Sequence, residues 1–316
     1  MKKIVYVTGC LGFIGSYVTR ACLKKGWYVK GIDKITYASN SNLLDEFTSY
    51  ENFSFTKCDI NDLEFLYDCD YVINTAAETH VGNSIVKSDD FVHSNINGVH
   101  HILELLRNYR QENNRTPVLL HFSTDEVYGD TSDGIHTETD LLKPSNPYSA
   151  TKAAADMLIL AWARTYKIPY VIVRPNNNYG INQYVEKLIP KSIKYLKIGR
   201  QIPLHNNGTP TRNWLHASDT AEAILSIIES GVRNEIFNIS GGLELSNIQV
   251  VSKIIHGMFG DVDINQYIDF SLKRPGVDVR YSVDDSKLRN LGWNPTINFD
   301  QALADIIDHY SKKFIW

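Results

Sequence analysis

The chain has 316 residues, of which 43% are hydrophobic and 22% are charged, and these proportions are ordinary for a globular protein with a sizeable core. Its formal net charge of −4 excludes the strongly basic surface of a typical nucleic-acid-binding protein. No stretch approaches the roughly 18 apolar residues of a membrane span, and the apolar run after Lys3 is too short for a secretion signal. We therefore expect a cytoplasmic protein with no nucleic-acid or membrane partner.

The cysteines and histidines predict neither a disulfide framework nor a metal site. Four cysteines at positions 10, 22, 58 and 69 fall in or beside expected core elements. Scattered buried thiols are typical of a reducing compartment. The ten histidines form no HExxH motif, and the cysteines form no paired CxxC motif, so no metal is expected.

The first part of the chain alternates apolar strands with amphipathic helices. Strands are expected at 4–7, 28–32, 53–58, 71–74, 118–122 and 170–173. Helices are expected from Ile14 to Leu23, from Asn95 to Tyr109 and from Pro147 to about Tyr166. Six strands that alternate with helices predict an α/β fold with a doubly wound parallel sheet.

The pattern changes after Arg174, where a polar turn cluster occupies 175–180. Shorter helices and strands are expected at 187–197, 202–205, 218–228, 236–239, 247–259 and 299–310. We interpret this part as a smaller C-terminal α/β domain that is partly interleaved with the first.

Three glycines follow the first strand directly. Gly9, Gly12 and Gly15 are spaced GxxGxxG, and such glycines let the backbone turn tightly and approach a pyrophosphate at a helix N-terminus. Asp33 ends the second strand, where a carboxylate can accept hydrogen bonds from an adenosine ribose and repel a 2′-phosphate. The pattern predicts a dinucleotide site that takes NAD rather than NADP, although the neighbouring Lys34 weakens that preference.

Acid–base residues cluster around the fifth expected strand. That strand leads directly into Thr124, Asp125 and Glu126, and ligands bind beyond the carboxyl ends of strands in an open parallel sheet. Tyr148 and Lys152 lie four residues apart in the third expected helix, so they share one helix face. These groups are sufficient for several proton transfers. Taken alone, the acidic pair would favour an acidic loop that solvates a strand end, and the tyrosine and lysine could be merely helix-surface residues.

Together these residues resemble the extended short-chain dehydrogenase/reductases and, more narrowly, the nucleoside-diphosphate-glucose 4,6-dehydratases. The resemblance spans essentially the whole chain. It rests on TGxxGFIG at 8–15, DKxTYA at 33–38, AAExH at 76–80, STDEVYG at 123–129, NPYSATK at 146–152, NNYG at 177–180, EKLIP at 186–190 and RPG at 274–276. The Thr-Asp-Glu triplet is the specific part, whereas the glycine loop and YxxxK mark only the superfamily.

The resemblance implies an NAD-dependent lyase that converts UDP-glucose or dTDP-glucose to the 4-keto-6-deoxy sugar nucleotide, a step towards rhamnose-type deoxysugars. Tyr148 would be the base on the 4-hydroxyl, with Lys152 favouring its phenolate and Thr124 binding the 4-oxygen. Glu126 would take the C5 proton, and Asp125 would protonate the departing C6 hydroxyl. Elimination needs one base and one acid at once, which explains the two carboxylates.

The same resemblance implies the binding residues and the assembly. The cofactor set is Gly9, Gly12, Phe13, Ile14, Gly15, Asp33, Lys34, Thr36, Asp59, Ile60, Ala76, Ala77, Ser94, Tyr148, Lys152 and Asn178. The substrate set is Thr79, Thr124, Asn177, Lys187, Leu188, Pro203, His205, Arg212, Asn247 and Arg274. The expected division assigns NAD binding to 1–180 and 214–244, and sugar-nucleotide binding to 181–213 and 245–316. A homodimer, or a higher homo-oligomer, is expected.

The chain departs from the pattern of bacterial dTDP-glucose enzymes at several positions. Gly82-Asn83 replaces an Asp-Arg pair, and Val277 replaces a frequent histidine. His205 and the pair Asn182-Gln183 look more like the eukaryotic UDP-glucose dehydratases. The nucleotide therefore stays open between thymidine and uridine diphosphate, with a slight preference for UDP.

Two other functions remain open at this point. A sugar-nucleotide 4-epimerase or a UDP-glucuronate decarboxylase would use the same NAD, tyrosine and lysine, but neither reaction requires the Asp-Glu pair. A module that only senses NAD or a sugar nucleotide would be expected to lack Tyr148 or Lys152, and the chain has both.

Overall fold

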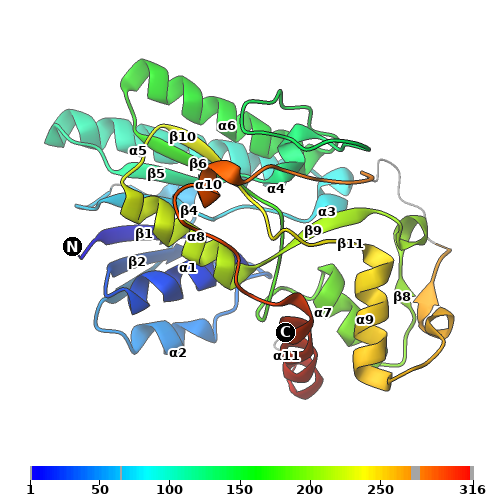
Figure 1. The fold of residues 1–316 in the computed structure, drawn as a ribbon. Coiled ribbons are helices and arrows are strands. Elements are labelled where there is room, and N and C mark those ends of the chain that lie inside the picture. Colours follow the sequence, from blue (N-terminus) through cyan, green and yellow to red (C-terminus); the bar gives the residue numbers. More distant parts are fainter. Residues whose placement is uncertain (1, 65, 272–277, 314–316) are drawn as a thin grey trace.

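A seven-stranded parallel sheet forms the centre of the computed structural model, which describes residues 2–64, 66–271 and 278–313 (Figure 1). The strand order is β3-β2-β1-β4-β5-β6-β10. The strands are β1 (Ile4–Thr8), β2 (Tyr28–Asp33), β3 (Phe53–Lys57), β4 (Tyr71–Asn74), β5 (Val118–Phe122), β6 (Tyr170–Pro175) and β10 (Glu235–Ile239). Because both faces of a parallel sheet are covered, its strands are nearly continuous apolar runs, and β5 is buried along its whole length.

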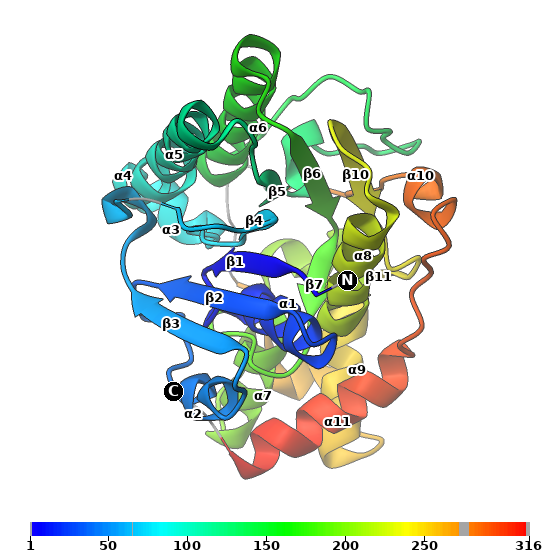
Figure 2. The same cartoon turned by 90° about the vertical axis from the view of Figure 1, so that its left-hand side faces the viewer.

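Helices cover both faces of this sheet (Figure 2). On one face α1 (Phe13–Lys24), α2 (Leu43–Thr48) and α8 (Ala217–Ser230) share a hydrophobic core with the strands. On the other face lie α5 (Gly98–Asn113) and α6 (Pro147–Tyr166), with a second core beneath them. The short helices α3 (Val81–Val86), α4 (Asp89–Phe91) and α10 (Ser286–Arg289) complete this part. The predicted doubly wound α/β fold is confirmed.

Two elements differ from the prediction. The strand at 235–239, expected among the shorter segments after Arg174, pairs in parallel with β6 and extends the sheet from six strands to seven. The helix expected from Asn95 begins later, because residues 92–97 form a π-helical turn, η2 (Val92–Asn97), in front of α5. In that turn Asn95 is fully buried and donates a hydrogen bond to Thr151 Oγ1 of α6 at 2.9 Å. A buried polar contact of this kind overrides the apolar periodicity that predicted a regular helix.

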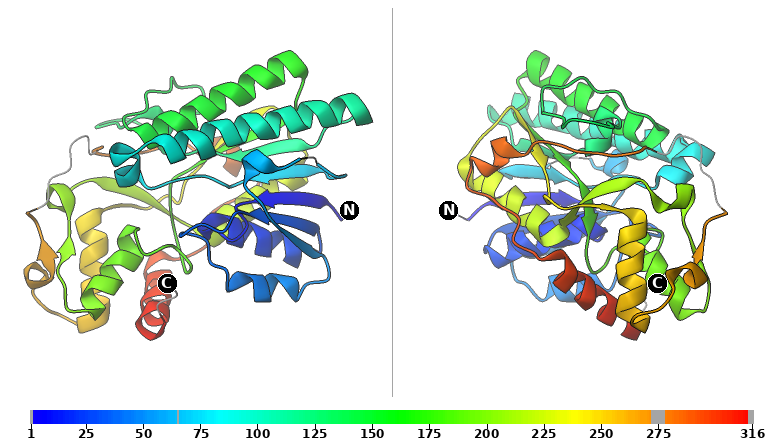
Figure 3. Two further views of the ribbon diagram at one scale, coloured as in Figure 1. Left: turned by 180° about the vertical axis from the view of Figure 1, so that it is seen from behind. Right: turned by 45° about the vertical axis from the view of Figure 1, so that its right-hand side comes forward.

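The remaining elements build a smaller lobe around a core of its own. It contains a three-stranded sheet of β7 (Asn177–Tyr179), β9 (Thr211–His216) and β11 (Glu244–Ser246), and a two-stranded sheet of β8 (Ile202–Pro203) and β12 (Ile268–Asp269). Its helices are α7 (Leu188–Lys197), α9 (Asn247–Phe259) and α11 (Phe299–Lys312), which stand together beside the large sheet in both views of Figure 3. Short 3₁₀ turns are η1 (Ile60–Asp62), η3 (Asp125–Tyr128), η4 (His205–Gly208) and η5 (Ile264–Tyr267).

The order of the strands in the sheet indicates where a ligand would bind. Strand β1 pairs with β2 on one side and with β4 on the other, so the chain reverses its direction of winding between β1 and β4. In doubly wound sheets ligands bind beyond the carboxyl ends of the strands at this reversal. Over the described parts of the chain, no helix has both the length and the apolar character that crossing a bilayer requires.

Candidate active site

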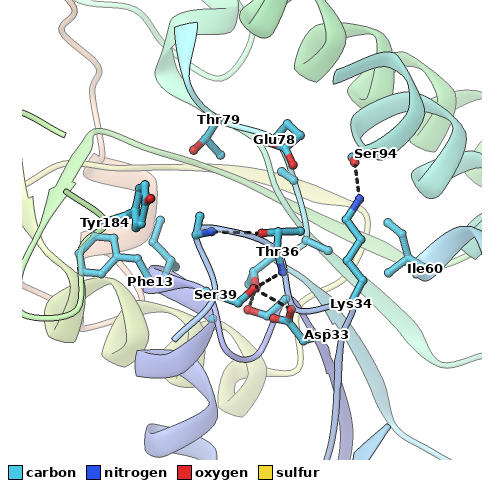
Figure 4. Close-up of a pocket in the computed structure, with 18 of the residues that line it drawn as sticks. Phe13, Asp33, Lys34, Thr36, Ser39, Ile60, Glu78, Thr79, Ser94 and Tyr184 are labelled. Atoms are coloured by element: carbon cyan, nitrogen blue, oxygen red, sulfur yellow. Dashed lines mark hydrogen bonds between the residues drawn. The ribbon is translucent and has the colours of Figure 1, made fainter. Parts of the chain in front are cut away.

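A cleft of about 980 Å³, counting the solvent in its open mouth, lies at the carboxyl ends of β1, β2 and β4. It is lined by most of the residues expected to bind a cofactor: Gly9, Gly12, Phe13, Ile14, Gly15, Asp33, Lys34, Thr36, Asp59, Ile60, Ala76, Ala77 and Ser94. Of that expected set, only Tyr148, Lys152 and Asn178 are absent from its lining. Figure 4 shows Phe13 and Tyr184 together at one end and Lys34 at the other.

The glycine loop at the floor of this cleft has the shape of an anion cradle. Helix α1 begins directly after Gly12, and no side chain caps its first turn. Gly9 has φ 70°, and a Cβ there would come within 2.9 Å of the backbone of Ala76. A Cβ at Gly15 would lie 2.0 Å from the carbonyl oxygen of Gly9. The unpartnered N–H groups of a helix N-terminus bind phosphates, and glycine allows their close approach.

Asp33 organises the turn beside the loop. Its Oδ1 accepts a hydrogen bond from Ser39 Oγ at 2.9 Å (Figure 4). The same Oδ1 accepts one from Ile35 N at 2.8 Å, and its Oδ2 accepts one from Leu11 N at 3.0 Å. A carboxylate oxygen can accept two hydrogen bonds, so Oδ2 keeps capacity for a ribose hydroxyl.

Lys34, which could have favoured a 2′-phosphate, is already paired. Its Nζ lies 3.3 Å from Asp59 Oδ2 and donates a hydrogen bond to Ser94 Oγ at 3.4 Å (Figure 4). Burial opposes the charge of Asp59, yet hydrogen bonds from Asn61 and the ammonium of Lys34 together lower the pKa of Asp59 to about 2. The lysine charge is therefore compensated within the protein, in agreement with a site for NAD.

The acidic pair lies at the end of β5, in the turn η3. Thr124 caps that turn, because its Oγ1 accepts a hydrogen bond from Glu126 N at 3.3 Å. Asp125 is only 3% exposed, and its Oδ2 accepts a hydrogen bond from Asn176 Nδ2 at 2.7 Å. Burial and the neighbouring charge of Glu126 raise the pKa of Asp125 to about 7. A carboxyl group with that pKa can donate a proton near neutral pH.

Glu126 sits in a different electrostatic environment. Burial raises its pKa, but the guanidinium of Arg212 and a hydrogen bond from Asn146 Nδ2 at 3.3 Å oppose that rise. Burial thus raises the pKa of both carboxyl groups, but the charge of Arg212 and the amide of Asn146 favour the carboxylate form of Glu126.

Tyr148 and Lys152 lie one turn apart on α6, as predicted. The Tyr148 hydroxyl hydrogen-bonds Thr124, but burial and the charge of Glu126 raise the Tyr148 pKa above its ordinary value. Lys152 is 2% exposed; burial lowers its pKa to about 8, and the charge of Asp156 opposes that fall. The resemblance implies that Lys152 favours the phenolate and so lowers the pKa of Tyr148. The pKa is raised instead, because desolvation of the buried phenol is the larger effect.

A second cleft, of about 880 Å³ with its open mouth, adjoins the first. Lys187 and Thr79 line both clefts, and Lys187 Nζ donates a hydrogen bond to the Thr79 carbonyl oxygen at 2.9 Å. Glu126 also faces this second cleft. Other expected substrate residues in its lining are Asn177, Leu188, Arg212 and Asn247.

A few expected site residues lie elsewhere or cannot be described. Asn178 lines the second cleft rather than the first, and its Oδ1 accepts a hydrogen bond from Thr220 Oγ1 at 2.6 Å. Pro203 and His205 belong to β8 and η4, and neither is part of the lining of the two clefts. Arg274 lies outside the described residues.

Comparison with known proteins agrees with this geometry. A family model described as GDP-mannose 4,6 dehydratase matches residues 6–306. A dTDP-glucose 4,6-dehydratase from Haemophilus influenzae is 39% identical over 329 residues, which is 97% of this chain and 97% of that protein. The chain belongs to the nucleotide-sugar 4,6-dehydratases of the extended short-chain dehydrogenase/reductase family.

Further relatives of this dehydratase act on different nucleotides. It is 37% identical over 326 residues to an Arabidopsis thaliana trifunctional enzyme whose name includes UDP-glucose 4,6-dehydratase, covering 99% of this chain and 48% of the plant protein. Its fold matches the crystal structure of DesIV, a dTDP-glucose 4,6-dehydratase from Streptomyces venezuelae that holds NAD. The TM-score is 0.91 at 33% identity, with 98% and 97% of the two chains covered.

The dehydratase also has site residues that the sequence did not single out. His121 is fully buried, with Nδ1 3.1 Å from Asn74 Nδ2 and Nε2 3.4 Å from Lys152 Nζ. A histidine inside the apolar run 118–122 was a usable signal. Glu78 and Glu186 line the cofactor cleft, and both fall inside motifs that carried the resemblance. The second cleft is also lined by residues that were not predicted as site residues: His80, Asn146, Asp278 and Tyr281.

Proposed function

We propose that the dehydratase removes water across C5 and C6 of UDP-glucose or dTDP-glucose, with NAD as its cofactor, and releases the 4-keto-6-deoxy sugar nucleotide. The observation that carries this proposal is the carboxyl pair of Asp125 and Glu126 beside Tyr148. Glu126 lines the second cleft, whereas Asp125 and Tyr148 are not part of the lining of either cleft. Burial raises the pKa of Asp125 to about 7, while the charge of Arg212 and a hydrogen bond from Asn146 favour the carboxylate form of Glu126. A 4-epimerase or a decarboxylase needs no such pair.

The residues of the first cleft fit NAD. The backbone N–H groups after Gly12 would hold the pyrophosphate, and Asp33 would bind the adenosine ribose. Lys152, which is not part of the lining of this cleft, would bind the nicotinamide ribose. The chemistry that bound NAD supplies is reversible hydride transfer, away from C4 at the start and to C6 at the end, so the reaction is redox-neutral. The small side chains of Ala76 and Ala77 leave room for the cofactor along one wall.

Tyr148 takes the proton of the 4-hydroxyl in the first step. Burial raises the pKa of Tyr148 and so disfavours its phenolate, and the positive charge of Lys152 one helical turn away is the group that would favour the phenolate. The hydrogen bond with Thr124 would place the Tyr148 oxygen beside the substrate 4-oxygen. The new C4 ketone makes the hydrogen on C5 acidic. Tyr148 and Thr124 then stay in contact with the ketone oxygen while the carboxyl pair acts.

Elimination follows from the two carboxyl groups. Glu126 takes the C5 proton as a base, while Asp125 gives its proton to the departing C6 hydroxyl, which leaves as water. A proton returns to C5 when the double bond is reduced at C6. Glu126 gives this proton back to C5 and ends the cycle as the carboxylate that it was at the start. Asp125 ends the cycle without its proton, and Tyr148 holds the proton of the former 4-hydroxyl. One proton therefore passes from Tyr148 to Asp125, directly or through solvent, before the next cycle, and with this transfer the charge and proton numbers balance.

The second cleft has the charge for a nucleoside diphosphate. Arg212 and Lys187 line it, and a guanidinium binds planar phosphate oxygens in pairs. The guanidinium of Arg212 also lies over the ring of Tyr281, 4.5 Å from its centroid, which fixes its direction. We assign sugar-nucleotide binding to 181–213 and 245–316, and NAD binding to 1–180 and 214–244.

The test is a parallel incubation with UDP-glucose and dTDP-glucose, followed by mass spectrometry. Loss of the mass of one water from either substrate, without net formation of reduced cofactor, is the expected result, and the faster reaction names the nucleotide. Glu126→Gln and Asp125→Asn should abolish that loss. An unchanged mass with both substrates would refute the dehydration, and UDP-glucuronate and 4-epimer substrates would then distinguish the two alternatives.

We further propose a homodimer in the cytoplasm. The exposed apolar side chains of Val92 and Met157 lie on η2 and α6, two elements that pack together, and support an interface there. The four cysteines are free thiols, in keeping with a reducing compartment. Light scattering should give twice the chain mass of 35.9 kDa, and a species of single mass would contradict the dimer.

A further inference from the structure

Asn146, the residue before Pro147 at the start of α6, uses its side chain in two directions. It is 8% exposed. Its Oδ1 accepts a hydrogen bond from Ser149 N at 2.9 Å and so caps the helix, while its own N–H donates to Ser149 Oγ at 3.3 Å. Its Nδ2 points away from the helix and donates to Glu126 Oε2 at 3.3 Å. One amide therefore joins the helix that carries Tyr148 to the carboxylate of Glu126.

The cap decides which end of the amide meets Glu126. Ser149 N is a donor and needs an acceptor, so the oxygen of Asn146 has to face the helix. The NH₂ group is then left to face Glu126. A flipped amide would place two donors together at the helix and two acceptors together at Glu126. The group beside Glu126 is therefore a donor that cannot take a proton.

The second hydrogen of this NH₂ group is also used. Ser145 Oγ donates to Asp278 Oδ2 at 2.7 Å, which leaves its lone pairs free to accept from Asn146 Nδ2 at 3.4 Å. The hydroxyl of Tyr281 donates to the same Oδ2 of Asp278. Asn146 is thus held from three sides, and its position relative to Glu126 is set by helix α6 on one side and by this chain of hydrogen bonds on the other.

The other charged and titratable groups that act on Glu126 come from several elements. Arg212 and Lys187 stabilise its charge, and Asp278 opposes it. Glu126 in turn acts on Asp125, Tyr148 and Tyr281. Arg212 and Lys187 are the two cations that we assign to the substrate diphosphate. Once a diphosphate compensates them, Asn146 is the neutral donor that remains with Glu126.

We propose that Asn146 is a positioning residue for the elimination step, which holds Glu126 as a carboxylate directed at C5 and ties it to the helix that carries Tyr148 and Lys152. This inference rests on the proposed function, because it takes Glu126 to be the base that removes the C5 proton. It assigns to Asn146 a role in the second step and none in the oxidation at C4.

The test compares Asn146→Asp, Asn146→Ser and Ser149→Ala with the wild type. Asp and Ser both cap helices well, so the first two variants keep the start of α6. Asn146→Asp replaces the NH₂ donor by a carboxylate oxygen that faces Glu126. When two carboxylates share a site, their repulsion strongly raises the pKa of one of them. Asn146→Ser removes the donor without adding a charge. Ser149→Ala weakens the capping box and leaves the contact with Glu126 intact.

The readouts are the pH profile of kcat and the isotope effects of substrate deuterated at C5 or at C4. For Asn146→Asp we expect the acid limb of the kcat profile to move to higher pH by about one unit or more. At any pH below the limb, each unit of this shift lowers kcat about ten-fold. We also expect a larger C5 isotope effect with no gain at C4. Asn146→Ser should shift the limb in the same direction by less. Ser149→Ala should lower the melting temperature and keep the wild-type pH profile.

Each outcome is decisive. A wild-type acid limb and C5 isotope effect in Asn146→Asp would overturn the proposal, and so would an equal shift of the limb in Ser149→Ala. If Asn146→Asp does not fold, the pH profile and the C5 isotope effect are measured on Asn146→Ser instead. A wild-type pH profile in Asn146→Ser would then overturn the proposal. A wild-type enzyme that releases no water from either substrate would instead refute the proposed function.

Discussion

Asp125 should destabilise the protein at the pH where it works. Its pKa of about 7, against 3.8 for an ordinary aspartate, means that the folded chain holds a proton that the unfolded chain releases between these two values. The unfolding free energy therefore falls as pH rises through that window, by about 1.4 kcal/mol per unit. Above pH 7 the accumulated cost reaches about 4 kcal/mol at most, because the carboxylate is then charged in both states.

The substitution Asp125→Asn removes this cost and keeps the shape. The amide oxygen can accept from Asn176 Nδ2 as Oδ2 does, and the NH₂ group can donate to Thr124 Oγ1, which lies 3.2 Å from Oδ1. The neutral amide thus imitates the protonated acid. We expect the variant to be inactive in water elimination and more stable than the wild type at pH 8.

Urea unfolding followed by tryptophan fluorescence, from pH 5 to pH 8.5, measures the difference. The stability advantage of Asp125→Asn should grow by about 3 kcal/mol between pH 5 and pH 7 and stay constant above that. An advantage that does not change with pH would show that Asp125 titrates near its ordinary value in the folded protein. That result would also remove the reason for assigning it the role of acid.

Three further predictions test other parts of the structure. Asp156→Asn should lower the unfolding free energy by about 3–5 kcal/mol in urea, because it leaves Arg174 buried at 2% exposure without the carboxylate 2.9 Å away; a loss below about 1 kcal/mol would contradict this. Gly9→Ala should abolish NAD binding in calorimetry, because the new Cβ meets backbone at 2.9 Å, whereas Gly26→Ala, with a similar φ of 72° and open space, should cost only about 1 kcal/mol and bind normally. Asp33→Asn should weaken NAD binding and narrow the preference over NADP, and an unchanged ratio of affinities would refute that role.

Short-range patterns were sufficient for much of this protein. Apolar runs and amphipathic periods located the strands and the longer helices of the large sheet, since these depend on neighbouring residues, but they missed the short helices α2, α3, α4 and α10. Pro147 marked the start of α6, and a spacing of four placed Tyr148 and Lys152 on one face. The glycine spacing located the cofactor cleft because a tight turn at a helix N-terminus has few chemical solutions.

Contacts between distant segments could not be read in this way. Two examples depend on how separate elements pack. One is the pairing of β10 with β6, and the other is the ion pair of Lys34 with Asp59, which keeps the lysine from a cofactor phosphate. The environments that set the pKa of Asp125 and Glu126 include distant residues, such as Asn146 and Arg212, which are 20 and 86 positions after Glu126. The type of a residue, and with it the chemistry that its side chain can do, is visible in the sequence. Its protonation state, its orientation and its hydrogen-bond partners depend on the side chains that folding brings beside it, and our proposal of one acid and one base depends on these surroundings of Asp125 and Glu126.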